Sequence, residues 1–364
     1  MRTEGNGGLR SSLRSIYRLT REPGEVREPF PLRHKLTAWR NGFLSFSEAL
    51  YGFPENDRGE YVSDYTRIFR CGRLNPAPEF LDQKFLLRSV LLRKGFPQPE
   101  TVALVTGDDV LLEPFLETTS YLRTTELERW LVERGGSFII KPQNGRFGRD
   151  IYLLEVRGGA LVRRRGRESA PFRLKVGRRE VLLIERRVQQ GAFWRGLYPE
   201  SSNTIRAMTL WTPGDEAPFL GGAAQRVGTA DTMPTDNFSG GGIAARIDLA
   251  SGRLGPGSRH PVKARGMQLR GITHHPDTGA QIEGAVIPHW DRVRDTVLRA
   301  AASLPTNRYV GWDVIVDDSG APVILEGNAR SGLDVLQVER GLLSDPAVRR
   351  FYERVGAIEV SKEY

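Results

Sequence analysis

The stretch that decides the fold is GWDVIVDDSGAPVILEGN, residues 311–328. Two apolar runs flank the turn sequence DDSG, so we predict a β-hairpin. On paired antiparallel strands Asp313 and Glu326 can converge on one face, and Asn328 leaves its strand on the same side as Glu326. Hard oxygen ligands in this arrangement suit Mg²⁺ that bridges nucleotide phosphates. The alternative is a charged hairpin tip, which fits poorly because the apolar run directly before Glu326 should be core.

A second informative stretch lies upstream of the hairpin. A predicted strand, Ser137–Lys141, ends in a lysine, and a glycine-containing turn over residues 143–149 follows after one proline. Binding of α- and β-phosphates requires a fixed cation together with backbone N–H groups that can approach closely. An ordinary surface β-turn explains this stretch about equally well.

The remaining segments mix helices and strands without strict βαβ alternation, which predicts an α+β fold. Predicted helices begin at Ser45 (with Glu48 completing a capping box), at Thr125 and after Asp345, and span Glu79–Lys94 and Trp290–Leu304. Further predicted strands are Thr101–Val105, Ile151–Val156, Val181–Ile184, Thr204–Trp211, Gly222–Gly228 and Ile243–Asp248. Residues 1–30 are rich in Gly, Arg, Ser and Pro, so we expect a loosely attached arm.

Composition narrows the class of protein. The 364 residues include a single cysteine, Cys71, which excludes an intrachain disulfide and any multi-cysteine metal site. No apolar run is long enough for a membrane span, and the start lacks a secretory h-region, so we expect a cytoplasmic protein. The chain contains no Walker A loop, no nucleophile-elbow serine motif and no dinucleotide-binding glycine motif.

Charge leaves one alternative open. The net charge is +9, and basic residues gather in residues 1–40 and in a run at residues 163–167. A basic protein that binds nucleic acid or another polyanion is therefore a possible class, although such bias more often reflects solvated surface.

Taken together, these segments resemble the ATP-grasp superfamily, most closely its branch associated with sugar-transfer gene clusters, over about residues 30–350. The hairpin at 311–328 carries the resemblance most sharply. Other matching segments are residues 138–142, 203–206, 236–237 with 240–242, and 287–290. The resemblance implies two α+β subdomains that grip ATP. It divides the chain into a basic arm and helical module (1–78) and an ATP-grasp domain (79–364). Within that domain we expect a lid subdomain at about 118–187 and a metal and substrate subdomain at about 188–355.

The resemblance also implies roles for individual residues. Arg206 would be catalytic, neutralising the transferred phosphoryl group. The ATP contacts would be Lys84 and Lys141 on the phosphates, Asn144, Gly145, Gly148 and Arg149 in the closing turn, Glu185 and Val188 at the adenine, and Gln189 at the ribose. The Mg²⁺ ligands, with two ions expected, would be Asp313, Glu326 and Asn328. Substrate contacts would be Asn203, Asn237 and Gly241. Asp150 departs from the family pattern, in which another glycine usually stands at that position.

The function implied is an ATP- and Mg²⁺-dependent carboxylate–amine ligase. A small-molecule acid would become an acyl phosphate, and an amine would then form the amide with release of ADP and phosphate. The resemblance to this branch of the superfamily also implies a role in the biosynthesis of cell-surface polysaccharides, or of peptides or secondary metabolites. An ATP-grasp kinase that phosphorylates a hydroxyl and a polyanion-binding protein remain the two alternatives.

Overall fold

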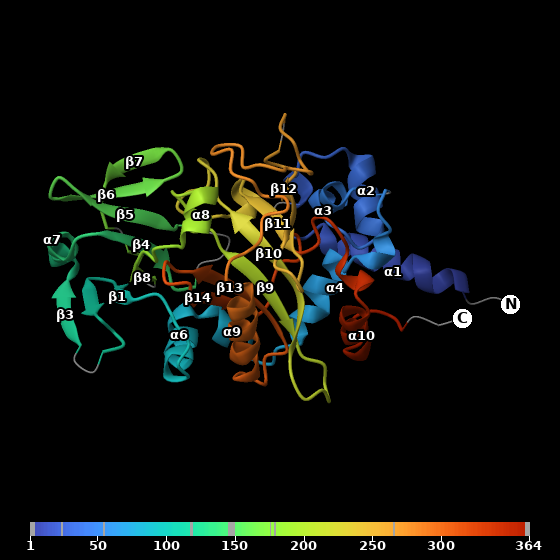
Figure 1. Ribbon diagram of the computed structural model, residues 1–364. Helices are drawn as coiled ribbons and strands as arrows, with labels where there is room; N and C mark the ends of the chain where they lie inside the picture. The colour runs from blue at the N-terminus through green and yellow to red at the C-terminus, as the bar shows by residue number, and fades with distance from the viewer. Residues whose placement is uncertain are drawn as a thin grey trace.

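The computed structural model describes residues 4–22, 25–53, 55–116, 119–144, 150–174, 176–177, 180–264 and 266–360. Two antiparallel sheets organise these residues (Figure 1). The eight-stranded sheet has the order β3-β2-β1-β8-β4-β5-β6-β7, and the six-stranded sheet has the order β12-β11-β10-β9-β13-β14. The α+β prediction is therefore confirmed.

The eight-stranded sheet is built from the middle of the chain. Its strands are β1 (Thr101–Thr106), β2 (Asp109–Leu112), β3 (Ser120–Arg123), β4 (Ser137–Pro142), β5 (Tyr152–Arg157), β6 (Ala160–Arg165), β7 (Glu168–Pro171) and β8 (Val181–Arg186). Helix α7 (Thr124–Arg134) covers one face, where Leu127 and Leu131 are fully buried against Phe138 and Ile184. The opposite face carries Lys141 of β4 and Glu185 of β8 together with Ile139 and Leu183, which lie beside them on the same side.

The six-stranded sheet forms the centre of the molecule (Figure 1). Its strands are β9 (Ile205–Leu210), β10 (Phe219–Val227), β11 (Ile243–Ile247), β12 (Leu254–Arg259), β13 (Tyr309–Val316) and β14 (Pro322–Asn328). Helix α9 (Trp290–Ala302) buries Val293 and Val297 against one face. Helix α10 (Pro346–Arg354) contributes Phe351 and Tyr352 to a second core. With both faces covered, every residue of β9 and β13 is buried.

The predicted hairpin is present as β13 and β14. Asp313 lies directly opposite Glu326, and on the other side of β13 it lies opposite Arg206 of β9. Facing residues on neighbouring antiparallel strands extend to the same side of a sheet. The register therefore aligns a cation and two carboxylates across three adjacent strands.

The helical elements complete the structure. They are α1 (Glu4–Leu19), α2 (Leu32–Arg40), α3 (Ser45–Tyr51), α4 (Asp64–Phe69), α5 (Pro78–Asp82), α6 (Lys84–Arg93) and α8 (Ala192–Leu197), and α1 to α4 lie at the end of the molecule opposite the eight-stranded sheet (Figure 1). Asp345 caps α10 by accepting from the amides of Ala347 and Val348, as predicted. None of the described helices combines the length and apolar character needed to cross a membrane.

Three local predictions were wrong. Residues 4–19 form a helix rather than a loose arm, and Leu19 is fully buried beside Trp39 and Leu44. Ser45 does not cap its helix, because its amide and hydroxyl donate to the buried carboxylate of Glu25 instead. The single helix expected over 79–94 is two helices, because Gln83 is extended with φ −89° and ψ 96°. This break places Lys84 in the first turn of α6.

Candidate nucleotide and metal site

Three charged side chains meet at the face of the eight-stranded sheet that lies opposite α7. Lys141 of β4 places its Nζ 2.8 Å from Oε2 of Glu185 on β8. Arg88 of α6 approaches the other oxygen of Glu185 at 2.6 Å and also donates to the hydroxyl of Thr101. All three charged side chains are buried. We call Arg88, Glu185 and Lys141 the charged trio.

The hairpin joins this group through α6. Lys84, one helical turn before Arg88, places its Nζ 3.2 Å from Oε2 of Glu326. Lys84 is 7% exposed, whereas the Glu326 side chain retains 27% exposure. Asn328 donates to the carbonyl of Gly311 at 3.2 Å and to Oε1 of Glu326 at 3.4 Å. Lys84, Lys141 and Glu326 are thus brought together from segments far apart in the chain.

Two arginines hold Asp313. Arg206 donates to its two oxygens from Nε at 2.5 Å and from Nη2 at 3.0 Å. Arg226, on β10, lies 3.3 Å from Oδ2 and forms a second ion pair with Asp236. Arg206 also donates to the hydroxyl of Ser331 at 3.1 Å. The arginine expected at the transferred phosphoryl group therefore lies beside the expected metal ligands.

A glycine makes room for this arrangement. A Cβ placed on Gly311 would overlap the hydroxyl of Ser331 and lie 3.3 Å from Cδ of Arg206. The residue two positions before Asp313 must therefore lack a side chain for the arginine to reach the carboxylate along the sheet. Any larger residue would push Arg206 or Ser331 out of place.

Burial and neighbouring charges shift the protonation equilibria of these groups. Burial lowers the pKa of Lys141, opposed by Glu185 and reinforced by Arg88 and Lys84. Burial tends to raise the pKa of Glu185, but Arg88 and Lys141 outweigh it, so that pKa is lowered. The pKa of Glu326 is also lowered, because the charges of Lys84, Lys141 and Arg206 outweigh burial. Glu185 and Glu326 are therefore anions at neutral pH.

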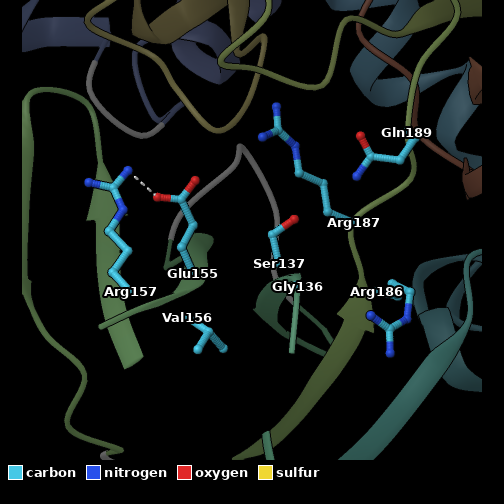
Figure 2. Close-up of a pocket in the computed structure, with 8 residues that line it drawn as sticks. All are labelled: Gly136, Ser137, Glu155, Val156, Arg157, Arg186, Arg187 and Gln189. Carbon is cyan, nitrogen blue, oxygen red and sulfur yellow. Dashed lines mark hydrogen bonds and ion pairs between the residues drawn. The ribbon is translucent and has the colours of Figure 1, made fainter. Parts of the chain in front are cut away.

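A pocket of about 370 Å³ opens at the start of β4, next to the segment that follows β8. Figure 2 shows Arg187 and Gln189 reaching toward it from that segment, and Ser137 and Glu155 reaching from the sheet. Its other lining residues are Gly136, Val156, Arg157 and Arg186. The pocket combines guanidinium, carboxylate, hydroxyl and amide groups with a larger share of apolar surface. Gln189, expected at the ribose, is thus placed in a cavity.

The other expected ATP contacts differ in their exposure, and some lie outside the described residues. Val188 is half-buried, beside Gln189. Asn144 is exposed at the end of the turn after β4. Gly145, Gly148 and Arg149 lie outside the described residues. Asp150, which departs from the family pattern, has a positive φ of 56°, a conformation that glycine adopts more readily.

The expected substrate contacts divide into two kinds. Asn237 lines a small pocket of about 70 Å³ with Thr232, Thr235 and Gly240, facing Arg165 of the eight-stranded sheet. Gly241 ends the short helical turn of residues 238–240 with a positive φ of 117°. Asn203, in contrast, is fully buried.

The side chain of Asn203 is fully engaged within the protein. Its amide donates to the carbonyls of Trp194 and Tyr198 at 2.8 and 2.7 Å. Its Oδ1 accepts from Ser201 and from the amide of Gly228 at 2.9 and 3.0 Å. These four bonds use its whole hydrogen-bonding capacity. Asn203 therefore positions the start of β9, and the expectation of a direct substrate contact does not fit.

The oxygen atoms of Asp313, Glu326 and Asn328 are of the kind that binds a magnesium ion. The described residues contain no cluster of three His, Cys, Asp or Glu side chains suited to a metal. The oxygens near the hairpin are two carboxylates and the amide of Asn328, and hard oxygens of this kind are what Mg²⁺ prefers, with water and phosphate completing its shell. Both oxygens of Asp313 are held by arginines, so Glu326 and Asn328 are the more accessible ligands.

Sequence reasoning missed two charged residues of the site, Arg88 and Arg226, and gave no role to Asp236 within the matching segment 236–237. Arg226 interrupts a strand of small and apolar residues, and Arg88 lies within the apolar spacing of α6. A charge at a position where the pattern requires a buried residue was the available signal. Cys71 is poorly suited to act as a nucleophile, because burial raises the pKa of its thiol to about 12.

Comparison with known proteins adds to this geometry. No curated protein sequence matches the chain. Solved structures that resemble it include the L-amino acid ligase from Bacillus licheniformis, 14% identical over 70% of this chain and 42% of that one, with a TM-score of 0.34. A D-alanine–D-alanine ligase from Bacillus anthracis is 13% identical over 77% and 66%, with a TM-score of 0.36. Biotin carboxylase from Campylobacter jejuni is 12% identical over 78% and 48%, with a TM-score of 0.42. The chain thus spans less than two thirds of these proteins, and similarity at this level says nothing about the reaction.

The family comparison is specific. The model of the sugar-transfer associated ATP-grasp family matches residues 69–349, which is most of the chain. That span contains both lysines, the arginine of β9 and the whole β13–β14 hairpin. Proteins with this fold generally use ATP and Mg²⁺. The chain belongs to the sugar-transfer associated ATP-grasp family and has the ATP-grasp fold.

Proposed function

We propose that this protein is an ATP- and Mg²⁺-dependent carboxylate–amine ligase that proceeds through an acyl phosphate and releases ADP and phosphate. The observation that carries the proposal is the meeting of Lys84, Lys141 and Arg206 around Glu326 and Asp313. Cations from both sheets and from α6 thus surround two carboxylates that can bind a divalent ion. Such an arrangement suits a triphosphate whose terminal group is transferred.

The pocket and the charged trio suggest how ATP would lie. Ser137 and Lys141 are on the same side of β4, four residues apart, which corresponds to about 13 Å. Adenosine in the pocket beside Ser137 and Gln189 would therefore place the phosphates near Lys141 and Lys84. Both oxygens of Glu185 bind cations, so we assign adenine recognition to the backbone near Val188 rather than to the Glu185 side chain.

The chain's own residues would act by positioning and by neutralising charge. Arg206 and Arg226 would shift from Asp313 toward the γ-phosphate as negative charge accumulates there. When bound, Mg²⁺ would neutralise the β- and γ-phosphate oxygens. An oxygen of the substrate carboxylate attacks the γ-phosphorus and ADP leaves. The amine nitrogen then attacks the acyl carbon, phosphate leaves, and the amine loses a proton.

We assign the substrates to the classes of small carboxylic acids and amines. Asn237 and Gly241 lie near the small pocket that faces Arg165, and we propose that this region contacts the acid. The family's association with sugar transfer supports a role in cell-surface polysaccharide, peptide or secondary-metabolite biosynthesis. We place the reaction in the cytoplasm, where ATP is available. The polyanion-binding alternative loses support, because Arg164 and Arg167 of the basic run pair with Glu200 and Asp231.

Product analysis tests the proposal. The protein is incubated with Mg²⁺, ATP, hydroxylamine and a panel of amino acids and uronic acids, and nucleotides are separated by chromatography. We expect ADP, phosphate and a hydroxamate, since hydroxylamine intercepts an acyl phosphate. AMP as the main product would contradict the proposal. A stable phosphorylated alcohol together with ADP would instead establish the kinase alternative.

A further inference from the structure

Arg88 is one of the most deeply buried charged residues in the described part of the chain. Its side chain is 1% exposed. It lies one helical turn after Lys84 on α6, and its partner Glu185 is 97 residues further along the chain. Each oxygen of Glu185 binds one cation, Oε1 binding Arg88 at 2.6 Å and Oε2 binding Lys141 at 2.8 Å. Lys141 is therefore held in place by a carboxylate that Arg88 holds in turn.

The charged trio carries one uncompensated positive charge. It contains two cations and one anion, and all three side chains are less than a tenth exposed. The neighbouring pair of Lys84 and Glu326 is already balanced. Burying an unbalanced charge is unfavourable unless an anion lies nearby.

Without Arg88, Lys141 and Glu185 would form a neutral internal ion pair. Such a pair attracts a phosphate only weakly, because the carboxylate repels what the ammonium attracts. With Arg88 present, the carboxylate is balanced by the arginine and the ammonium retains its net effect on a nearby anion.

We propose that Arg88 is a positioning residue of the nucleotide site: by balancing Glu185, it leaves the charged trio with one net positive charge that attracts a phosphate. The proposal rests on the proposed nucleotide binding and identifies how that site is made selective for an anion. Arg88 acts through Glu185 and Lys141 rather than by contact with the nucleotide.

Calorimetric titration of the full chain with Mg·ATP tests this. Arg88→Met should bind ATP at least ~10-fold more weakly. The reason is that the attraction between one buried unit charge and a phosphate exceeds the 1.4 kcal/mol of binding free energy that corresponds to a tenfold change in affinity. Arg88→Lys retains the charge and should stay within ~3-fold of the wild type. The double variant Arg88→Met/Glu185→Gln removes one charge of each sign, so its affinity should rise at least ~5-fold above that of Arg88→Met. Arg93→Met, an exposed position of the same helix, is the matched control and should bind like the wild type.

The recovery in the double variant distinguishes a charge effect from a structural one. If Arg88 only supported the fold, removing Glu185 as well would not restore binding. Equal affinities of Arg88→Met and the double variant would therefore overturn the proposal, as would wild-type affinity in Arg88→Met. If Arg88→Met does not fold, Arg88→Gln makes the same change of charge with a polar side chain, and wild-type ATP affinity in Arg88→Gln would then overturn the proposal. Failure of the wild type itself to bind ATP would refute the proposed function instead.

Discussion

Asn203 provides a sharp test of how the structure assigns roles, because the sequence places it in a family motif and the structure makes it internal. Asn203→Ala would remove all four side-chain hydrogen bonds. The carbonyl of Trp194 keeps a second bond from the amide of Tyr198 at 3.1 Å. The carbonyl of Tyr198 and the amide of Gly228 are left without another partner among the described residues.

The cost follows from these two groups. A buried backbone group left unsatisfied costs about 1–3 kcal/mol, so we expect Asn203→Ala to lose about 3 kcal/mol of the free energy of unfolding. Ser201→Ala is the matched control, since it removes only one bond to Asn203 and should cost about 1 kcal/mol. Urea denaturation followed by far-ultraviolet circular dichroism measures both.

Binding separates the two readings of Asn203. The folded Asn203→Ala protein should bind Mg·ATP like the wild type. The change in its KM for the acid substrate, expressed as a free energy, should be smaller than its loss in the free energy of unfolding. A variant as stable as the wild type but with a KM raised tenfold would refute the structural role and restore the direct contact.

The remaining predictions concern the site and its surroundings. Glu326→Gln should lower turnover at least ~100-fold by weakening the magnesium site. It should cost about 1 kcal/mol of the free energy of unfolding or less, because its ion pair with Lys84 is partly exposed. Near-normal ADP formation would exclude the metal role. Arg206→Ala should abolish hydroxamate formation, because the contact of Arg206 with the transferred phosphoryl group strengthens as negative charge develops in the transition state. ATP binding should be kept, since Arg226 still balances the charge of Asp313. Hydroxamate formation at the wild-type level would contradict this role. Burial lowers the pKa of His275 below its usual 6.5, so the unfolded chain binds more protons in acid. Stability should therefore fall as the pH drops below about 6.5, and the loss between pH 7.5 and 5.5 should be smaller in His275→Gln; equal losses would assign the effect to other groups.

Local patterns predicted the parts of this protein that short-range physics controls. The β13–β14 hairpin, the cap at Asp345 and the strand that carries Lys141 each depend on a few adjacent residues, on turn chemistry and on alternation. The two strands that carry Asp313 and Glu326 followed from the hairpin, but their direct pairing depends on a shift of register between Asp313 and Val314, which the pattern does not encode. These elements could be located without any knowledge of the rest of the fold.

Other features depended on contacts between distant segments. The helix over residues 4–19 is rich in glycine and serine, and its packing of Leu19 against Trp39 offsets a weak intrinsic propensity. Gln83 breaks a periodic apolar stretch, although the pattern on either side is helical. In both cases tertiary packing outweighed the local preference.

The sequence by itself determined the fold class, the hairpin and the order of motifs that carries the family resemblance. Only the tertiary structure decided which charges share the site: that Arg88 meets Glu185 across 97 residues, that Arg226 joins Arg206 at Asp313, and that Asn203 is internal. The physical reason is the range of the interactions. Hydrogen bonding within a hairpin acts between neighbours in the chain, whereas a buried ion pair depends on which distant segments packing brings within a few ångströms, and residue spacing does not encode that distance.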